Sequence, residues 1–232
     1  HRRGSSRERV PNGGDIVTVV DEGNNFIGKA FYSDKSEISL RIFTIRQETI
    51  DKGFWRQKII ESVNRRKNSR LSTLDSRLTN AFRLINSEAD LIPSLIVDNY
   101  DENLVIQTLS QGTEKLKETF VEILREEFQP KSIIQRNDAR VRLLEGLEQI
   151  NSTLYGEVAD EIIIEQDGVK FYVSLLDGQK TGSFLDQREN HFVSRNYAFG
   201  RALDCFTFNG GFALNLAKNC DFVLALDISE DA

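Results

Sequence analysis

The sequence predicts a multidomain protein of mixed α/β and α+β class, on three observations. Short alternating segments separated by turns fill residues 14–45 and predict a small β-barrel or half-barrel. Strand and helix patterns then follow one another through the middle of the chain, which predicts a central α/β domain. Near the C-terminal end, two short apolar strands flank a glycine-containing turn and a short helix. That is the pattern of the first βαβ unit of a nucleotide-cofactor fold.

Composition narrows the class of protein. The chain has 232 residues, of which 39% are hydrophobic and 28% charged, and this is an ordinary soluble composition with enough residues for a sizeable core. No apolar run approaches the ~18–20 residues of a membrane span, and the first ten residues lack the apolar stretch of a signal peptide. Cys205 and Cys220 lack paired-cysteine spacing. We therefore expect a cytoplasmic protein with two buried, reduced thiols, no membrane partner and no metal site.

The N-terminal segments predict three strands, over residues 15–20, 26–32 and 37–45. The turns between them are rich in Asp, Asn, Gly and Ser, which tolerate tight backbone conformations. Gly28 lies inside the second strand and is interpreted as a bulge.

Residues 51–70 predict a helix that carries a cluster of basic side chains. A net charge of -6 argues against a protein that coats nucleic acid over its whole surface, but it leaves room for a local basic face. The cluster is therefore either a phosphate-contacting face for RNA or an ordinary solvated helix surface. This helix and an exposed barrel edge also leave room for a homodimer. The basic residues are Arg56, Lys58, Arg65, Arg66 and Lys67.

The middle of the chain alternates strands and helices. An amphipathic helix is predicted over residues 114–128 from apolar residues at i, i+4 spacing, and a β-hairpin is predicted around residues 166–168. The other predicted elements are strands at 94–97, 103–109 and 132–135 and a short helix at 138–144 with Gly146 as its cap; residues 81–85 lead into this segment without an assigned element.

The C-terminal strands, residues 202–206 and 222–226, enclose the turn Thr-Phe-Asn-Gly-Gly. Small residues there allow the backbone to approach a cofactor closely. The turn is not a GxGxxG motif, so it is less suited to the close approach of a pyrophosphate. Asp227 after the second strand is placed to accept hydrogen bonds from ribose hydroxyls. S-adenosylmethionine fits this pattern better than a dinucleotide. Asp204, inside the first strand, is explained by backbone or cofactor contacts.

The segment before this unit is polar with two apolar residues at its centre, and reads GQKTGSFLDQREN. It predicts either a lid over a polar ligand or a helix start capped by Asp186.

These motifs resemble a known signature. DGQKTGSFLDQREN, ALDCFTFNGGFAL and ALDIS resemble a bacterial family of RNA cytosine-5 methyltransferases that modify 23S ribosomal RNA. Residues 14–44 resemble the PUA domain of that family, a small RNA-binding barrel, and residues 82–110 and 132–147 resemble its central domain. The resemblance covers nearly the whole chain.

The resemblance implies a PUA-like barrel with its following helix at 1–72, a central α/β domain at 73–165 and, at 166–232, the start of a Rossmann-like methyltransferase domain. It implies S-adenosylmethionine as cofactor and ribosomal RNA as partner. The cofactor-binding residues that it implies are Phe184, Asp186, Arg188, Asp204, Phe206, Asn209, Gly211, Asp227 and Ile228.

The resemblance also implies that the catalytic residues lie outside this chain. Cytosine C5 becomes nucleophilic only after a thiolate adds at C6, and we expect that cysteine beyond Ala232, since Cys205 and Cys220 fit structural roles. The chain as given is expected to be a truncated domain that cannot catalyse. Two alternatives stay open: an RNA-binding protein with a degenerate cofactor fold, and methylation of another base atom such as guanine N2. A nicotinamide enzyme fits least.

Overall fold

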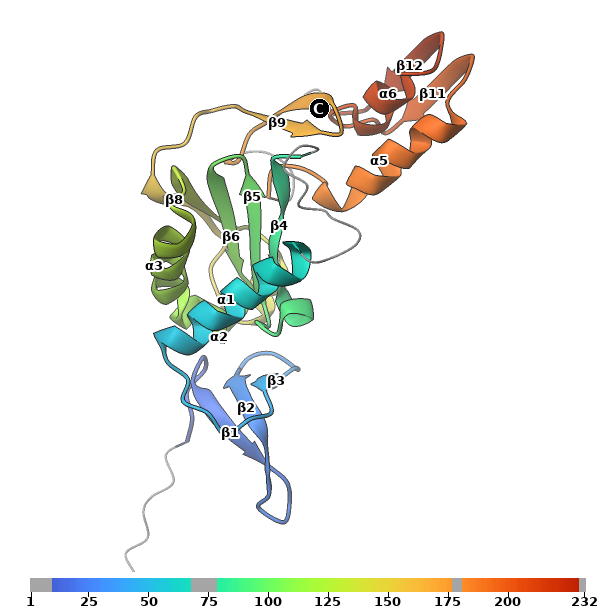
Figure 1. The fold of residues 1–232 in the computed structure, drawn as a ribbon. Helices are drawn as coiled ribbons and strands as arrows, with labels where there is room; N and C mark the ends of the chain where they lie inside the picture. The colour runs from blue at the N-terminus through green and yellow to red at the C-terminus, as the bar shows by residue number, and fades with distance from the viewer. Residues whose placement is uncertain (1–9, 68–78, 177–180, 230–232) are drawn as a thin grey trace, which may run out of the picture.

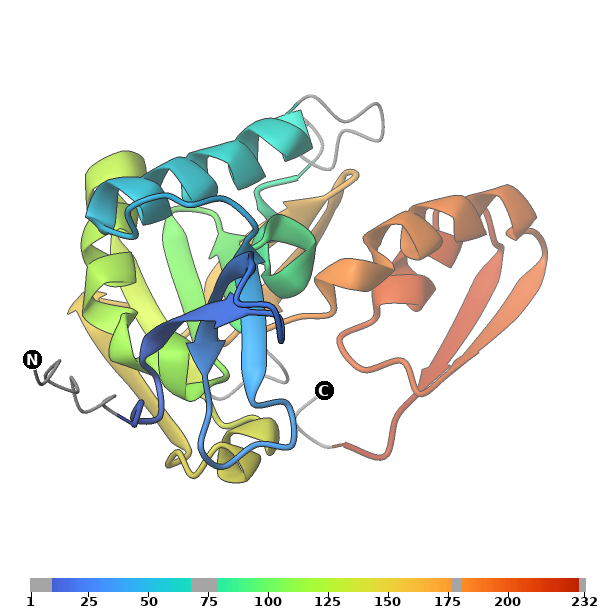
Figure 2. The same ribbon diagram turned by 90° about the horizontal axis from the view of Figure 1, so that it is seen from below.

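The chain forms three successive parts in the computed structural model, which describes residues 10–67, 79–176 and 181–229. An N-terminal antiparallel sheet is followed by a five-stranded central sheet with helices, and a βαβ unit follows a further hairpin (Figure 1). Seen from below, the βαβ unit extends to one side of the central sheet (Figure 2). Among the described residues, no helix combines the length and apolar composition needed to cross a bilayer.

The N-terminal sheet has the three predicted strands in sequence order. They are β1 (Ile16–Val20), β2 (Phe26–Tyr32) and β3 (Leu40–Thr44), all antiparallel. The β1–β2 register shifts between Val19, which pairs with Gly28, and Val20, which pairs with Phe26. This irregularity beside Gly28 agrees with the predicted bulge. A Cβ on Gly28 would lie 2.7 Å from the carbonyl oxygen of Thr44, so only glycine lets β2 and β3 approach here.

Helix α1 (Lys52–Lys67) joins the N-terminal sheet to the central domain. Trp55, Ile59 and Val63 recur every four residues and form its buried face. The Trp55 ring stacks on Phe31 of β2 at 5.4 Å between centroids, and meets Phe120 of the central domain edge-on at 5.5 Å. The helix was predicted over residues 51–70, and its last predicted residues lie outside the described part of the chain.

The central sheet has two more strands than the sequence predicts. Strands β6 and β7 are parallel and all other neighbours are antiparallel. The two missed strands are the first and the last in spatial order, at the edges of the sheet, and most residues of the last one are exposed, which leaves no buried face to mark it. In spatial order the strands are β4 (Ala81–Asn86), β5 (Leu95–Tyr100), β6 (Asn103–Thr108), β7 (Ser132–Asn137) and β8 (Ile150–Gly156).

The connection from β6 to β7 differs from the prediction. Instead of one helix over 114–128 there are two, α2 (Gln111–Lys115) and α3 (Lys117–Phe128). Leu116 between them has φ -97° and ψ 4°, which breaks the helical geometry. The other short elements of this domain are the 3₁₀ helix η1 (Ser87–Asp90) and α4 (Val141–Leu144), shorter than predicted, with Gly146 in the left-handed conformation (φ 68°) after it.

Both faces of the central sheet are covered. Helices α1 and α3 cover one face with a core that includes Phe120 and Leu124. The hairpin β9 (Ile162–Gln166) and β10 (Val169–Val173) covers the other face. Its turn residues Asp167 and Gly168 both have positive φ, as a type I′ turn requires, and this confirms the predicted hairpin.

This packing bears on the predicted domain boundaries at 72/73 and 165/166, which we retain as a proposal. Helix α1 shares a core with the central domain, and the β9–β10 hairpin spans the second boundary.

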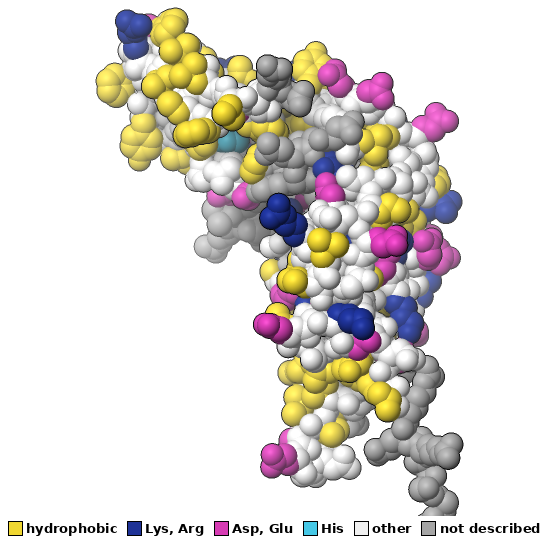
Figure 3. Space-filling view, turned by 180° about the vertical axis from the view of Figure 1, so that it is seen from behind, with side chains coloured by type: hydrophobic (Ala, Val, Ile, Leu, Met, Phe, Trp, Pro, Cys, Tyr) yellow, Lys and Arg dark blue, Asp and Glu magenta, His cyan; other side chains and the backbone are white. Residues whose placement is uncertain are grey.

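The C-terminal unit follows the hairpin. The 3₁₀ helix η2 (Leu185–Gln187), α5 (Arg188–Ser194) and the 3₁₀ helix η3 (Arg195–Tyr197) lead into β11 (Arg201–Cys205), α6 (Gly211–Leu216) and β12 (Phe222–Leu226). Strands β11 and β12 are parallel neighbours, as expected for a βαβ unit. Apolar side chains gather on the surface of this unit (Figure 3), among them Leu203, Leu224 and Leu226.

The cysteines lie in this unit and correct a prediction. Both thiols are free, as expected, but Cys205 is exposed and Cys220 is only half-buried. Cys205 follows Asp204 in β11, and successive strand residues face opposite sides of a sheet. Asp204 faces α6, so Cys205 lies on the side that the described chain leaves open.

One carboxylate makes the stability of the central domain depend on pH. Burial alone would raise the pKa of Asp90, but hydrogen bonds from Arg66 and from the Asn86 N–H outweigh it and hold that pKa below its usual range. A depressed folded-state pKa adds stability above the unfolded pKa of about 4 and loses it as pH falls through the folded value. We expect Asp90→Asn to cost about 1–3 kcal/mol at pH 7. Urea unfolding at pH 7 and near pH 3 measures the effect. The difference in free energy of unfolding between wild type and Asp90→Asn should be smaller at the lower pH, and an equal difference at both would contradict a role for the Asp90 carboxylate.

Candidate functional site

A pocket of about 410 Å³ opens where β11 and β12 end at their carboxyl edge. It lies between the β11–α6 turn and the segment that carries η2 and α5. This is the edge at which open α/β sheets bind ligands. Its lining residues are Ser183, Phe184, Gln187, His191, Phe206, Thr207, Phe208, Asn209, Gly211, Phe212 and Asp227.

The turn after β11 is conformationally strained. Phe206 (φ 63°), Phe208 (φ 50°) and Gly210 (φ 82°) all have left-handed backbone. Each non-glycine residue in that region costs about 1–2 kcal/mol, so the surrounding contacts must hold the turn in place. Both phenylalanines line the pocket, and Phe206 is 86% exposed. The turn therefore presents aromatic surface to a ligand.

Asp227 lies at the end of β12 and fixes the same turn. Its two carboxylate oxygens accept hydrogen bonds from the N–H groups of Phe208 (2.7 Å) and Ser229 (2.9 Å). The N–H of Ser229, followed by that of Phe208, holds the pKa of Asp227 below its usual range. The group is thus anionic near neutral pH, and each oxygen keeps a lone pair for a further donor.

Asp204 supports the turn from behind. Its Oδ2 accepts hydrogen bonds from the Ala213 N–H in the first turn of α6 (2.9 Å) and from the Thr207 hydroxyl (2.6 Å). A carboxylate at a helix N-terminus also interacts favourably with the helix dipole. The backbone contact predicted for this strand residue is confirmed, whereas its contact with a cofactor stays a prediction.

His191 is one of the pocket residues that were not predicted from the sequence; the others are Ser183, Gln187, Thr207, Phe208 and Phe212. Its ring meets Phe212 edge-on at 4.6 Å, and a Cβ on Gly211 would lie 2.4 Å from the ring atom Cε1. Gly211 is therefore small because the imidazole occupies the adjoining space. Burial lowers the pKa of His191 below its usual range despite the charges of Asp204 and Asp186, so the ring is neutral at pH 7. A single histidine on a short helix carries no sequence signal that marks it.

The segment before α5 divides its side chains between two hollows. Phe184 lines the pocket and packs edge-on against Phe208 at 5.3 Å. Asp186 and Arg188 instead line a neighbouring hollow with Arg66, and Arg188 pairs with Asp167 at 3.0 Å.

Two further predictions concern the edges of this site. The suggested cap by Asp186 is wrong, because the N-cap position of α5 is Gln187. Ile228 is 95% exposed and is absent from the pocket lining. Residues 178–180 of the predicted lid lie outside the described part of the chain.

A buried polar cluster anchors the pocket rim to the central sheet. The Tyr100 hydroxyl accepts a hydrogen bond from the Ser183 N–H (3.1 Å) and lies 2.9 Å from the Thr181 hydroxyl. Thr181 also donates to Asp98 (2.7 Å), which Arg83 holds in a bidentate ion pair. Burial, and then the charge of Asp98, raises the pKa of Tyr100, which keeps the hydroxyl protonated.

Most of the predicted RNA-contacting residues on α1 form ion pairs with acidic side chains. Arg56 pairs with Glu126 and Glu127 of α3, and Arg65 and Arg66 both pair with Asp90. Lys58 instead extends over the Phe54 ring, with Nζ 5.5 Å from its centroid. The side chain of Lys67 lies outside the described part of the chain. Among the residues that the structure describes, no cluster of metal-ligating side chains is present.

Comparisons with known proteins agree on one class. A family model for a PUA-like domain matches residues 5–45. A ribosomal RNA large subunit methyltransferase I from Pseudoalteromonas atlantica is 38% identical over 220 residues, which cover 94% of this chain and 55% of that protein. The protein of the same name from Vibrio cholerae is 36% identical over 234 residues, covering 99% of this chain and 58% of that protein. The homologues of this chain are ribosomal RNA large subunit methyltransferases. The chain spans a little more than half of their length.

Solved structures establish the fold. A candidate SAM-dependent methyltransferase from Streptococcus mutans superimposes with a TM-score of 0.79 at 20% identity, covering 96% of this chain and 57% of that chain. A candidate methyltransferase complexed with SAH gives the same TM-score over 95% of this chain and 56% of that chain. The predicted fold class is confirmed: a PUA-like N-terminal domain and a Rossmann-like methyltransferase fold, to which the β11–α6–β12 unit belongs.

Proposed function

We propose that this chain is part of an S-adenosylmethionine-dependent methyltransferase that modifies large-subunit ribosomal RNA. The observation that carries the proposal is the anionic Asp227 at the carboxyl end of β12, beside an aromatic-lined pocket. The names of the relatives supply the substrate class. A protein that modifies ribosomal RNA is expected in the cytoplasm of a bacterium.

The residues of the pocket fit this cofactor. Its volume of about 410 Å³ is in the usual range for small-molecule sites, and rings such as Phe206 and Phe208 offer surface for an adenine. The free lone pairs of Asp227 suit the two ribose hydroxyls. S-adenosylmethionine supplies an electrophilic methyl group on a positively charged sulfur. Among the residues predicted to bind it, Phe184 and Asn209 also line the pocket.

We further propose that the methylated atom is C5 of a cytosine in 23S ribosomal RNA. This chemistry needs a thiolate that adds to C6 and a base that later removes the C5 proton. Cys205 and Cys220 do not line the pocket, and the Cys220 thiol lies 3.6 Å from the Phe199 carbonyl oxygen, to which it donates. The nucleophile is therefore expected from a part of the protein outside this chain.

The test is methyl transfer by the full-length protein. Tritiated S-adenosylmethionine and deproteinised 23S RNA are incubated with it, and the labelled nucleoside is identified after complete digestion. Label in 5-methylcytidine is the expected result. Label in a guanine would exclude the cytosine-C5 proposal while leaving an RNA methyltransferase.

Calorimetric titration with SAH distinguishes the proposed methyltransferase from an RNA-binding protein that does not bind the cofactor. Binding of SAH is expected. Absence of both binding and methyl transfer, with RNA still bound, would indicate an RNA-binding protein with a degenerate cofactor fold.

A further inference from the structure

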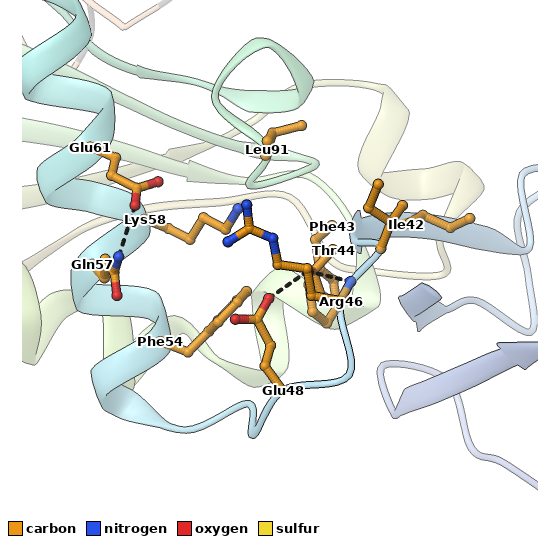
Figure 4. A pocket seen from close by; sticks show the side chains of 11 residues that line it. Ile42, Phe43, Thr44, Arg46, Glu48, Phe54, Gln57, Lys58, Glu61 and Leu91 are labelled. Carbon is orange, nitrogen blue, oxygen red and sulfur yellow. Dashed lines mark hydrogen bonds between the residues drawn. The ribbon is translucent and has the colours of Figure 1, made fainter. Parts of the chain in front are cut away.

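A second pocket, of about 440 Å³, lies between the N-terminal sheet and the central domain (Figure 4). Strand β3 and the segment after it form one wall, α1 forms another, and Leu91 closes a third side. It is remote in sequence from the residues that line the cofactor pocket. Its lining residues are Ile42, Phe43, Thr44, Ile45, Arg46, Glu48, Phe54, Gln57, Lys58, Glu61 and Leu91.

Two cations extend into this pocket without an acidic partner among the described residues. Lys58 reaches in from α1, and Arg46 reaches in from the segment after β3 (Figure 4). The other basic side chains described on α1, such as Lys52 and Arg56, are held in ion pairs with acids of α3 or with Asp90. Lys58 is therefore the basic side chain of α1, among those described, that has no acidic partner.

The two acids of the pocket accept hydrogen bonds from uncharged donors. Glu48 accepts a hydrogen bond from the Thr44 hydroxyl (2.5 Å), and Glu61 accepts one from the Gln57 amide (3.0 Å). These contacts are drawn in Figure 4. Since neither acid is paired with Arg46 or Lys58, both cations remain available to an anionic ligand.

The remaining lining is apolar. Ile42 and Leu91 are 41% and 49% exposed, and Phe54 on the α1 side of the pocket is half-buried. Unpaired bases in single-stranded RNA are bound by apolar and aromatic surfaces, while Lys and Arg bind the adjoining phosphates. We propose that this pocket binds one nucleotide of single-stranded RNA, with its base between these apolar side chains and a phosphate at Arg46 and Lys58. The proposal rests on the proposed function, which makes RNA the substrate.

Helix α1 runs from this pocket to the hollow that adjoins the cofactor pocket. Lys58 and Arg66 are separated by about 12 Å along the helix axis, at 1.5 Å per residue. Arg66 lines the hollow that also contains Asp186 and Arg188. The segment carrying those two residues presents its other side, through Phe184 and Gln187, to the cofactor pocket. One RNA strand that follows α1 would therefore lead from the second pocket to the site of methyl transfer.

The test measures RNA affinity and its salt dependence without cofactor. A short fluorescein-labelled single-stranded RNA is titrated by anisotropy with the full-length protein at several KCl concentrations. The double variant Arg46→Gln/Lys58→Gln is expected to bind about tenfold more weakly near physiological salt. Its log–log salt slope should be smaller by about 0.7, because the two cations contact one phosphate and each single-strand phosphate contact contributes about 0.7.

The matched control is Lys52→Gln/Arg56→Gln, which removes the same charge from cations already paired with Glu122, Glu126 and Glu127. Its affinity should stay within about twofold of wild type, since surface charges that are compensated contribute little to steering. An equal loss in both double variants, or no loss in either, would overturn the proposal. Thermal melting by circular dichroism verifies that each variant is folded.

Two more outcomes are informative. Tighter binding of a polyglutamate peptide than of the RNA, lost in Arg46→Gln/Lys58→Gln, would show that the pocket takes an acidic peptide and would refute an RNA site. The methyl-transfer assay on the same preparations distinguishes failure of the proposed RNA pocket from failure of the proposed methyltransferase function. If Arg46→Gln/Lys58→Gln alone loses RNA affinity but the wild-type protein does not methylate RNA, only the methyltransferase function is refuted. If the wild-type protein methylates RNA but Arg46→Gln/Lys58→Gln keeps its RNA affinity, only the RNA pocket is refuted.

Discussion

Replacing Gly211 with alanine is expected to weaken SAH binding by the full-length protein about tenfold. The new Cβ would lie 2.4 Å from Cε1 and 2.6 Å from Nε2 of His191, which is below van der Waals contact. The imidazole must then move, but Phe212 packs edge-on against it at 4.6 Å. Overpacking of this kind costs about 1–3 kcal/mol, and about 1.4 kcal/mol corresponds to a tenfold change in affinity. Calorimetric titration with SAH measures the effect.

The matched control is the double variant Gly211→Ala/His191→Ala. Removing the imidazole gives the new methyl group room, so the double variant should bind SAH more tightly than Gly211→Ala alone. Such recovery is the coupling that a double-mutant cycle detects. If the two substitutions were additive, the loss would not come from the contact between Gly211 and His191.

Local patterns predicted the elements of this fold well. Alternation with turn residues located β1 to β3, and the Asp167–Gly168 turn located the β9–β10 hairpin. The βαβ unit was predicted because strand, turn and strand-terminal acid follow one another within a short stretch. In each case the physical cause acts between residues that are close in sequence. The break at Leu116 between α2 and α3 escaped prediction because the apolar spacing continues through it.

The site was predicted only in part, because its other half depends on distant contacts. Phe206 and Asp227 line the pocket from the βαβ unit itself. Arg188 instead pairs with Asp167, and Asp186 lines the neighbouring hollow with Arg66, which local sequence does not show. The basic cluster on α1 gives the same lesson. Arg56 is compensated by Glu126, which is 70 residues away, so a run of charges in sequence overstated the free charge on the surface.

Asp98 belongs to the buried polar cluster that anchors the pocket rim to the central sheet, and replacing it is expected to have the largest effect on stability. Asp98 has no exposed side-chain surface, and it accepts two hydrogen bonds from Arg83 (2.9 and 3.0 Å). It also accepts one from Thr181 at 2.7 Å. Asp98→Ala would leave a partly buried guanidinium without its partner. Breaking a buried pair from one side costs about 3–5 kcal/mol, so urea unfolding should show a loss of that size.

The same substitution is expected to loosen the cofactor pocket, since Thr181 would lose the acceptor that fixes it beside Tyr100. Hydrogen exchange should then accelerate at the Ser183 amide, which donates to the Tyr100 hydroxyl. The control is Asp98→Ala/Arg83→Met, which removes both charges and should recover part of the stability, because no unpaired charge remains. It should not restore protection at Ser183, because Thr181 still lacks Asp98. Full protection at Ser183 in Asp98→Ala would mean that Tyr100 alone holds the rim, and that the carboxylate serves only the arginine.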